Sequence, residues 1–151
     1  MAEIILQKAT IGNIPELLAI EEKLTNLKTY SAGTEAKDWE NELNKKTATV
    51  YLVLKDKNIV GDVSYDKKSD ELVEITGFAI DPKFQKQGIG KQVLTIIFEE
   101  LKNIKTIKLV THPENSVAIK IYLSFGFIIK GWNDNYYGDG QPRIIMVKEN
   151  L

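Results

Sequence analysis

Residues 72–91 read LVEITGFAIDPKFQKQGIGK, the most informative run of this chain. Its first nine residues are rich in β-branched and aromatic side chains and predict a strand, which the pair Asp81-Pro82 ends. Apolar residues then recur at helical spacing over about Gly90–Lys102. The polar, glycine-bearing segment Gln85–Lys91 is therefore expected to follow a strand and open a helix.

A helix start of this composition is suited to binding an anion. The backbone N–H groups of a first helical turn have no partners within the helix, and glycine lets a phosphate approach them closely. Lys86 and Lys91 add positive charge beside Gly88 and Gly90. The plainer alternative is a glycine turn that merely starts a helix, and the loop alone does not decide between the two.

Two common nucleotide-binding loops do not fit this segment. A phosphate-binding loop of the G-x-x-x-x-G-K-S/T type requires glycine where Gln85 stands and a hydroxyl where Gln92 stands. A dinucleotide-binding fingerprint requires a third small residue where Val93 stands. The sequence therefore supports neither kind of nucleotide site.

Apolar periodicity and turn residues divide the rest of the chain into further elements. Strands are expected over residues 4–9, 47–54, 59–65, 106–111, 127–132 and 143–148, and helices from about 14 to 24, 35 to 45 and 115 to 125. The turns Asp56-Lys57-Asn58 and Asp66–Asp70 predict an antiparallel meander, whereas the later strand–helix–strand passage predicts a parallel pair. We expect an α/β (α+β) fold with a mixed, mostly antiparallel central sheet of six to seven strands flanked by about four helices.

Length and composition limit the classes of protein to consider. The 151 residues, 43% hydrophobic and 27% charged, predict a single domain over residues 1–151. A formal net charge of −1 provides no chain-wide attraction to nucleic acid or an anionic membrane, so we expect neither as a partner. The first seven residues carry no basic segment followed by a long apolar run, and no stretch is long enough to span a bilayer. The cytoplasm is the expected location.

The chain contains no cysteine and one histidine. Disulfides, thiolate metal sites and a covalent cysteine nucleophile are excluded by the first count. A site with several histidine ligands is excluded by the second. We therefore expect no metal cofactor.

Three motifs together resemble the GNAT superfamily of N-acetyltransferases. Gln85, Gly88 and Gly90 match its Q/R-x-x-G-x-G/A signature, and residues 74–82 look like its fourth strand. Residues 115–127 resemble its N-x-x-A-x-x-x-Y…GF segment. The motifs are weak separately and specific jointly. The order of predicted elements is also that of the family, so the resemblance covers essentially the whole chain.

The resemblance implies a reaction and a cosubstrate. Acetyl-CoA would supply an acetyl group to a primary amine, either a small amine or polyamine or a peptide amine, by direct attack. The implied coenzyme-binding residues are Phe78, Ala79, Ile80, Gln85, Lys86, Gln87, Gly88, Ile89, Gly90, Lys91, Asn115 and Tyr122. In this arrangement the strand pairs with the pantetheine arm, the loop wraps the pyrophosphate, and the N–H of Phe78 polarises the acetyl carbonyl.

Tyr122 is implied as the general acid. A coenzyme thiolate leaves with a conjugate pKa of about 8.5, so a phenol with a pKa of about 10 can donate a proton or a hydrogen bond to it. Asn115 lies two helical turns earlier and is expected on the same face. The alternative is that Tyr122 belongs only to the apolar stripe formed with Ala118, Ile121 and Phe125.

Glu74 is implied as the general base, because it precedes Gln85 by eleven residues, as the catalytic glutamate does in the histone-modifying branch. A protonated alkylamine must lose a proton before it attacks, and a strand carboxylate can take that proton directly or through water. The alternative is a solvated strand residue. The family's other usual position for a carboxylate base holds Val110 here. His112, the single histidine, and a water chain are further candidates for the base.

The acceptor is less well defined. Similar proteins shape its pocket from the first two helices and the loop between the last two strands. Those segments supply aromatic and acidic residues that suit a cationic amine, namely Glu21, Glu22, Tyr30, Trp39, Trp132, Asp134, Tyr136, Tyr137 and Asp139. Such residues are also common in loops without a function. A non-catalytic acyl-CoA-binding sensor or interaction module on the same fold is the alternative function, and similar proteins are commonly homodimers.

Overall fold

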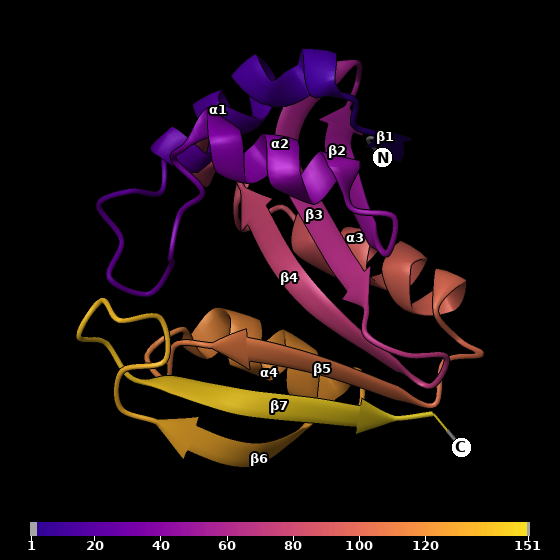
Figure 1. The fold of residues 1–151 in the computed structure, drawn as a ribbon, viewed down its shortest axis with the longest axis vertical. Helices are drawn as coiled ribbons and strands as arrows, with labels where there is room; N and C mark the ends of the chain where they lie inside the picture. The colour runs from indigo at the N-terminus through magenta and orange to yellow at the C-terminus, as the bar shows by residue number, and fades with distance from the viewer. Residues whose placement is uncertain (1–2, 151) are drawn as a thin grey trace.

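The computed structural model describes residues 3–150 and confirms the expected fold class (Figure 1). The strands are β1 (Ile4–Lys8), β2 (Ala48–Lys55), β3 (Asn58–Lys67), β4 (Leu72–Ile80), β5 (Thr106–Thr111), β6 (Ile128–Asn133) and β7 (Arg143–Glu149). The α-helices are α1 (Ile14–Glu22), α2 (Ala36–Asn44), α3 (Ile89–Glu100) and α4 (Ser116–Ser124). Met1, Ala2 and Leu151, which the single-domain and signal-peptide expectations included, lie outside the described residues.

The strands form a mixed sheet in the order β1-β2-β3-β4-β5-β7-β6. Neighbouring strands are antiparallel except β4 and β5, which pair in parallel through residues 72–74 and 106–108, as the strand–helix–strand passage predicted. Beyond this short pairing, β4 follows β3 while β5 stays with β7 (Figure 1). The sheet therefore splits at its centre, and the C-terminal ends of β4 and β5 stand apart.

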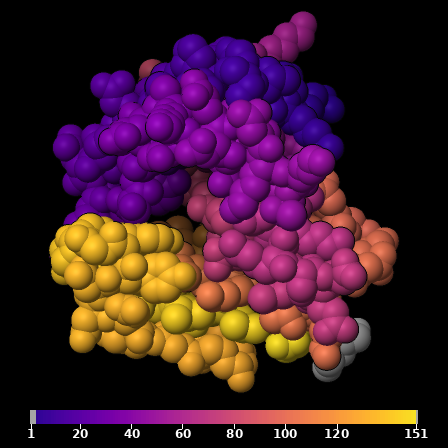
Figure 2. All heavy atoms as spheres, viewed as in Figure 1, coloured from indigo at the N-terminus to yellow at the C-terminus, as the bar shows by residue number. Residues whose placement is uncertain are grey.

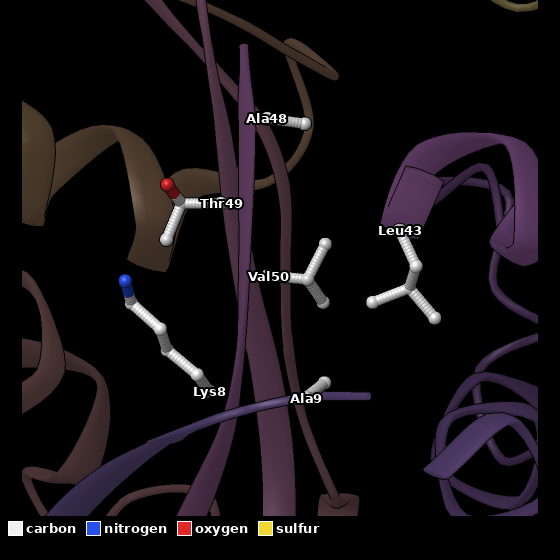
Figure 3. A pocket seen from close by; sticks show the side chains of 6 residues that line it. All are labelled: Lys8, Ala9, Leu43, Ala48, Thr49 and Val50. Atoms are coloured by element: carbon white, nitrogen blue, oxygen red, sulfur yellow. The ribbon is translucent and has the colours of Figure 1, made fainter. Parts of the chain in front are cut away.

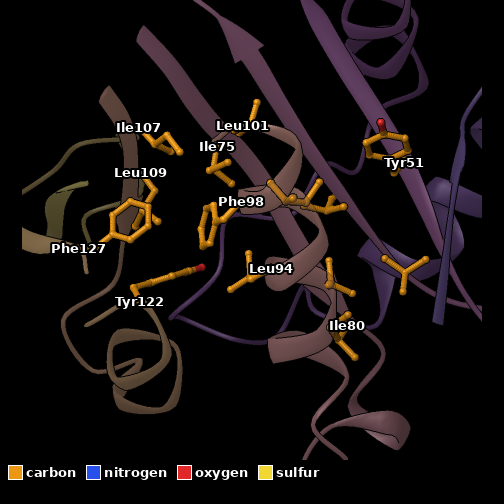
Figure 4. Close-up of a cluster of buried hydrophobic side chains, with 14 of the residues drawn as sticks. Tyr51, Ile75, Ile80, Leu94, Phe98, Leu101, Ile107, Leu109, Tyr122 and Phe127 are labelled. Atoms are coloured by element: carbon orange, nitrogen blue, oxygen red, sulfur yellow. The ribbon is translucent and has the colours of Figure 1, made fainter. Parts of the chain in front are cut away.

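The main hydrophobic core lies beneath α3 and α4 (Figure 4). Apolar residues of α3 recur with helical spacing, so Val93, Leu94 and Ile97 share one buried face. They join Ile107 and Leu109, which alternate with more exposed residues along β5. This core holds the two halves of the sheet together on the side where the strands diverge.

A second core fills the opposite face, beneath α1 and α2. Trp39 packs with Leu17 and Leu52, and its indole N–H donates to the carbonyl of Gly33 at 3.1 Å. The expectation that Trp39 helps to shape an acceptor pocket is therefore wrong, because its indole ring and N–H are both engaged in the core.

Strand β3 is longer than predicted. The sequence indicated that it ends at Tyr65 and that Asp66 begins a polar turn, whereas the strand continues through Lys67. Asp66 is buried, and its Oδ2 accepts hydrogen bonds from Lys45 Nζ at 2.7 Å and Lys68 Nζ at 3.1 Å. The two ammonium groups compensate the buried charge, which is why a residue typical of turns is accommodated in a strand.

We expect Asp66→Asn to destabilise the protein by roughly 1–2 kcal/mol at pH 7. Burial would raise the pKa of Asp66, but hydrogen bonds from Lys45 and Lys68 lower it to about 2. A depressed folded-state pKa stabilises the fold above the unfolded-state value of about 3.9, and this contribution is lost as pH falls through about 2. Urea unfolding of both proteins at pH 7 and pH 2.5 would measure it. An equal difference at both pH values would contradict the assignment.

Candidate active site

A cavity of about 410 Å³ lies where β4 and β5 diverge. Its walls come from the second half of β4, the loop before α3, the end of β5, and α4. The connections between α1 and α2 and between β6 and β7 complete its rim. Figure 2 shows the surface hollowed between the N-terminal segments and the yellow C-terminal loop. This cavity is called the cleft below.

A β-bulge accounts for the shape of the cleft. The register of β3 with β4 shifts between Ser64 and Tyr65, which leaves Thr76 as an extra residue in β4. A bulge bends its strand and increases its twist. It directs residues 77–80 away from β5, so this edge of β4 has no strand partner within residues 3–150. Such an edge offers N–H and C=O groups that can pair with an extended, amide-bearing ligand.

The loop between β4 and α3 has the backbone geometry of an anion cradle. Lys86 and Gly88 adopt left-handed conformations, with φ of 66° and 76°, and Gly88 is the N-cap of α3. The N–H of Gln92 donates to the Gly88 carbonyl at 3.2 Å and begins the hydrogen bonding of α3. The N–H groups of the residues just before Gln92 therefore have no partner within the helix. These amides and the helix dipole favour negative charge at this end of the cleft.

Both glycines of the loop are explained by their surroundings. A Cβ at Gly88 would have no atom within 4 Å, so it would project into open space at the cleft. A Cβ at Gly90 would lie 3.3 Å from the Phe78 ring, so the absence of a side chain lets α3 start close to β4. The side chain of Gln85 donates to the carbonyl of Ile80 at 3.0 Å and ties the loop to the end of β4.

The structure brings nearly all of the predicted coenzyme residues around the cleft. Those that line it are Phe78, Ala79, Ile80, Gln85, Lys86, Gly88, Ile89, Gly90, Lys91, Asn115 and Tyr122. Gln87 does not line it, because its side-chain oxygen accepts a hydrogen bond from Lys55 Nζ at 2.6 Å. A role for Gln87 toward a ligand would have to come from its backbone amide.

Tyr122 belongs both to the core and to the cleft. Its ring lies 5.8 Å from that of Phe127 and its side chain is 6% exposed, yet it is among the residues that line the cleft. In Figure 4 its hydroxyl points from α4 toward α3. Burial raises the pKa of Tyr122, so its hydroxyl keeps its proton at neutral pH. The two interpretations of its sequence context are therefore compatible.

Asn115 and His112 hold the junction of β5 with α4. Asn115 is the N-cap of α4, and its Oδ1 accepts from the N–H of Ala118 at 3.4 Å. His112 is fully buried, its Nδ1 accepts from the N–H of Glu114 at 3.0 Å, and its Nε2 lies 2.9 Å from Gln141 Oε1. Both ring nitrogens of His112 are thus engaged within the protein, which favours a structural role over proton transfer.

Glu74 lies just outside the cleft. It is the last β4 residue paired with β5, and its Oε2 is 3.5 Å from Lys108 Nζ. The residues that line the cleft begin with Ile75 on this strand. Its predicted role as general base therefore stays a prediction, and it would require a water molecule between Glu74 and the amine.

Of the residues suggested for the acceptor pocket, Tyr30 and Tyr137 line the cleft. Trp132 does not, because it lies 57% exposed on β6 and donates to Asp134 Oδ1 at 2.7 Å. Glu21 is buried behind Tyr30, whose hydroxyl is 3.1 Å from Glu21 Oε2. Fewer of the aromatic and acidic residues suggested for the acceptor pocket therefore line the cleft than the sequence indicated.

Arg143 is a cleft residue that the sequence did not reveal. It is 1% exposed, its Nη2 donates to Asp139 Oδ2 at 2.9 Å, and its guanidinium lies 5.1 Å from the ring centroid of Tyr137. The sequence showed only an arginine at the start of the last strand. Its burial depends on the fold of the β6–β7 connection, which no local pattern predicts.

Other features of the described chain carry less chemistry. A depression of about 100 Å³ lies beside the end of β1 and the start of β2, where Lys8 and Thr49 flank one side of β2 and Leu43 and Val50 the other (Figure 3). Across residues 3–150, no three histidine or acidic side chains are grouped so as to hold a metal ion. The described helices are all too short or too polar to cross a bilayer.

Comparison with known proteins agrees with this architecture. A profile of the acetyltransferase (GNAT) family matches residues 16–127. A curated relative, the ribosomal protein bS18-alanine N-acetyltransferase of Escherichia coli strain K12, is 36% identical over 73 residues, which are 46% of this chain and 49% of that protein. The chain thus spans about half the length of the curated relatives it matches.

Solved structures match over nearly the whole chain. The ribosomal-protein-S18-alanine N-acetyltransferase from Escherichia coli superposes with a TM-score of 0.82 at 21% identity and covers 97% of this chain and 94% of its own. A GNAT family acetyltransferase from Elizabethkingia anophelis with acetyl-CoA bound gives 0.74 at 23% identity, with 97% of each chain covered. These likenesses show the fold. Because the family profile itself spans most of the sequence, the chain belongs to the GNAT family of acetyltransferases.

Proposed function

We propose that this protein is an acetyl-CoA-dependent N-acetyltransferase that moves the acetyl group to a primary amine by direct attack. The observation that carries the proposal is the cleft, where an unpaired strand edge, a helix N-terminus and a tyrosine side chain meet around about 410 Å³. Each of these three features suits a different part of an acyl-coenzyme.

The coenzyme would bind along two surfaces of the cleft. The pyrophosphate would accept hydrogen bonds from the backbone amides of Gln87–Lys91, where the left-handed conformations of Lys86 and Gly88 support an anion cradle. The pantetheine arm would pair with the free edge of β4 at residues 78–80. This arrangement would place the thioester deeper in the cleft, toward Tyr122.

The chemistry would then follow from two hydrogen-bond donors. The N–H of Phe78 would polarise the acetyl carbonyl and stabilise the oxyanion that forms when the amine attacks. Tyr122 would donate its proton, or a hydrogen bond, to the sulfur as the carbon–sulfur bond breaks. Burial raises the pKa of Tyr122, which keeps the hydroxyl protonated and favours hydrogen-bond donation to the sulfur over complete proton transfer.

The acceptor class is an amine of a small molecule or of a peptide. The relative named for ribosomal protein bS18-alanine supports a peptide amine, although its similarity covers about half of each chain. A thiol-release assay with acetyl-CoA and a panel of alkylamines, polyamines and N-terminal peptides would test the proposal. We expect coenzyme A release with at least one amine. Tight acetyl-CoA binding without release for any acceptor would favour the non-catalytic sensor instead.

We propose Glu74 as the base, acting through water, and expect Glu74→Gln to lower kcat/KM about tenfold or more at neutral pH. Glu71→Gln is the matched control, because Glu71 is a neighbouring carboxylate whose side chain is 73% exposed and pairs loosely with Lys105 at 4.0 Å. Rates of both variants with the best amine of the panel would decide the matter. Equal rates for the two variants would remove Glu74 from the mechanism.

A further inference from the structure

Two buried carboxyl groups lie behind the acceptor end of the cleft. Glu21 on α1 is 2% exposed and Asp62 on β3 is 0% exposed. Glu21 Oε1 accepts from the N–H of Gly33 at 2.8 Å, and both of its oxygens lie within 3.2 Å of the Tyr30 hydroxyl. No described residue donates to either oxygen of Asp62. The carboxyls of Glu21 and Asp62 are called the carboxyl pair below.

The two carboxyls of the pair differ in their surroundings. Glu21 accepts hydrogen bonds from a backbone amide and a phenol, whereas Asp62 is fully buried without a donor from the described chain. Burial, followed by the charge of Glu21, raises the pKa of Asp62 well above its usual range. Burial thus favours the protonated form of Asp62, while the two hydrogen bonds that Glu21 accepts suit a negative charge on that side chain.

That negative charge has no cationic partner among residues 3–150. The ion pairs of the described chain lie elsewhere, for example that of Lys23 with Asp81 and that of Arg143 with Asp139. The hydrogen bonds to Glu21 come from a phenol and a backbone amide, which are neutral. A buried charge without a counterion is costly, so a positively charged ligand in the cleft would stabilise it.

The pair lies directly behind the cleft wall. Tyr30 and Gly77 both line the cleft, and Tyr30 contacts Glu21. A Cβ at Gly77 would lie 2.7 Å from Ser64 Oγ and 3.9 Å from Asp62 Oδ1, so Asp62 lies close to the Gly77 backbone that lines the cleft. Because the Tyr30 hydroxyl donates to Glu21, its lone pairs remain available to accept an N–H from a ligand.

We propose that the acceptor binds at the Tyr30 end of the cleft as a primary ammonium whose positive charge is balanced by the carboxyl pair. Tyr30 accepts one of its N–H groups. The inference rests on the proposed function and narrows it, because it selects acceptors that are cationic before they react. A neutral acceptor of the same shape would leave the buried charge without a counterion.

Thioethers of coenzyme A test this without knowledge of the natural acceptor. S-(3-aminopropyl)-CoA places an ammonium beyond the sulfur, whereas S-butyl-CoA has the same length and no charge. We expect the wild-type protein to bind the aminopropyl compound about tenfold more tightly by calorimetry, the effect of one charge pair roughly 10 Å apart at an intermediate dielectric. Aminoalkyl chains of two to five carbons would locate the best spacing.

Variants of the pair give a distinctive pattern. Asp62→Asn leaves Glu21 in place and should retain most of the preference for the ammonium. Glu21→Gln leaves only Asp62, whose ionisation burial opposes, and should lose most of the preference. The double variant E21Q/D62N carries no charge there, and its preference should fall to about one. Glu22→Gln is the matched control, because Glu22 is the exposed neighbour on the same helix and its loss should change nothing.

Each outcome has a separate meaning. Equal affinities of the wild-type protein for the two thioethers would overturn the inference, as would a preference that survives in E21Q/D62N. The wild-type comparison stands even if the double variant does not fold. Failure of the wild-type protein to bind coenzyme A or either thioether would instead contradict the proposed function.

Discussion

Gly88→Val is expected to weaken acetyl-CoA binding by roughly a hundredfold, with little loss of the fold. Gly88 has φ of 76°, which a β-branched residue adopts at a cost, and its Cβ would project into the open space of the cleft. A valine there would both strain the cradle and occupy the path of the pyrophosphate. Calorimetric titration with acetyl-CoA would measure the loss.

The control for this variant is Gly138→Val. Gly138 has φ of 79° and also no atom within 4 Å of a Cβ, but it lies in the β6–β7 connection and does not line the cleft. It therefore reproduces the backbone strain without the steric block. Acetyl-CoA affinity should be retained in Gly138→Val. If Gly88→Val also binds as tightly as the wild-type protein, the loop before α3 is not the pyrophosphate site.

Tyr122→Phe is expected to lower kcat by about a hundredfold while the affinity for acetyl-CoA changes less than about threefold. Phenylalanine preserves the packing against Phe127 and removes only the hydroxyl that would donate to the leaving sulfur. Steady-state rates with the best amine of the panel and a separate binding titration would distinguish catalysis from binding.

Tyr51→Phe provides the corresponding control. Tyr51 is another buried tyrosine, but its hydroxyl donates to Glu100 at 2.8 Å and it does not line the cleft. Its loss should reduce stability and leave kcat unchanged. A large loss of acetyl-CoA affinity in Tyr122→Phe, with kcat preserved, would show that Tyr122 serves the architecture and not the chemistry.

The elements of this fold could be predicted because their local signals agree with the tertiary structure. The apolar residues of α3 recur with helical spacing and all face one core. The hairpin between β2 and β3 was expected at Asp56-Lys57-Asn58, and Asp56 and Lys57 both take the positive φ that tight hairpin turns require. For this hairpin, the turn residues and the strand periodicity thus indicated the same break between β2 and β3.

The shape of the cleft could not be predicted in this way. It depends on a bulge at Thr76, where the sequence Ile75-Thr76-Gly77-Phe78 resembles an ordinary strand. Asp62 similarly resembles a solvent-facing residue in an alternating strand. Only the packing of α1 over β3 reveals that Asp62 is fully buried beside Glu21. Such features arise from contacts between segments distant in sequence, which local patterns do not record.

Glu74 and Tyr122 show what motif spacing can and cannot predict about the position of a site residue. The spacing to Gln85 selected Glu74, yet the ion pair with Lys108 and the short parallel pairing place it at the edge of the cleft. Tyr122 was selected by its helical motif, and it lines the cleft as that motif implies. The helical motif therefore predicted the position of Tyr122 in the cleft. The position of Glu74 depends on where β4 bends, which the motif does not record.

A crystal structure of the protein with coenzyme A would test the coenzyme cleft most directly. The account predicts pyrophosphate oxygens within hydrogen-bonding distance of the backbone amides of Gln87–Lys91. It also predicts the pantetheine arm along residues 78–80 of β4 and the sulfur beside the Tyr122 hydroxyl. Coenzyme bound elsewhere on the protein, with side chains filling the space between β4 and β5, would contradict it.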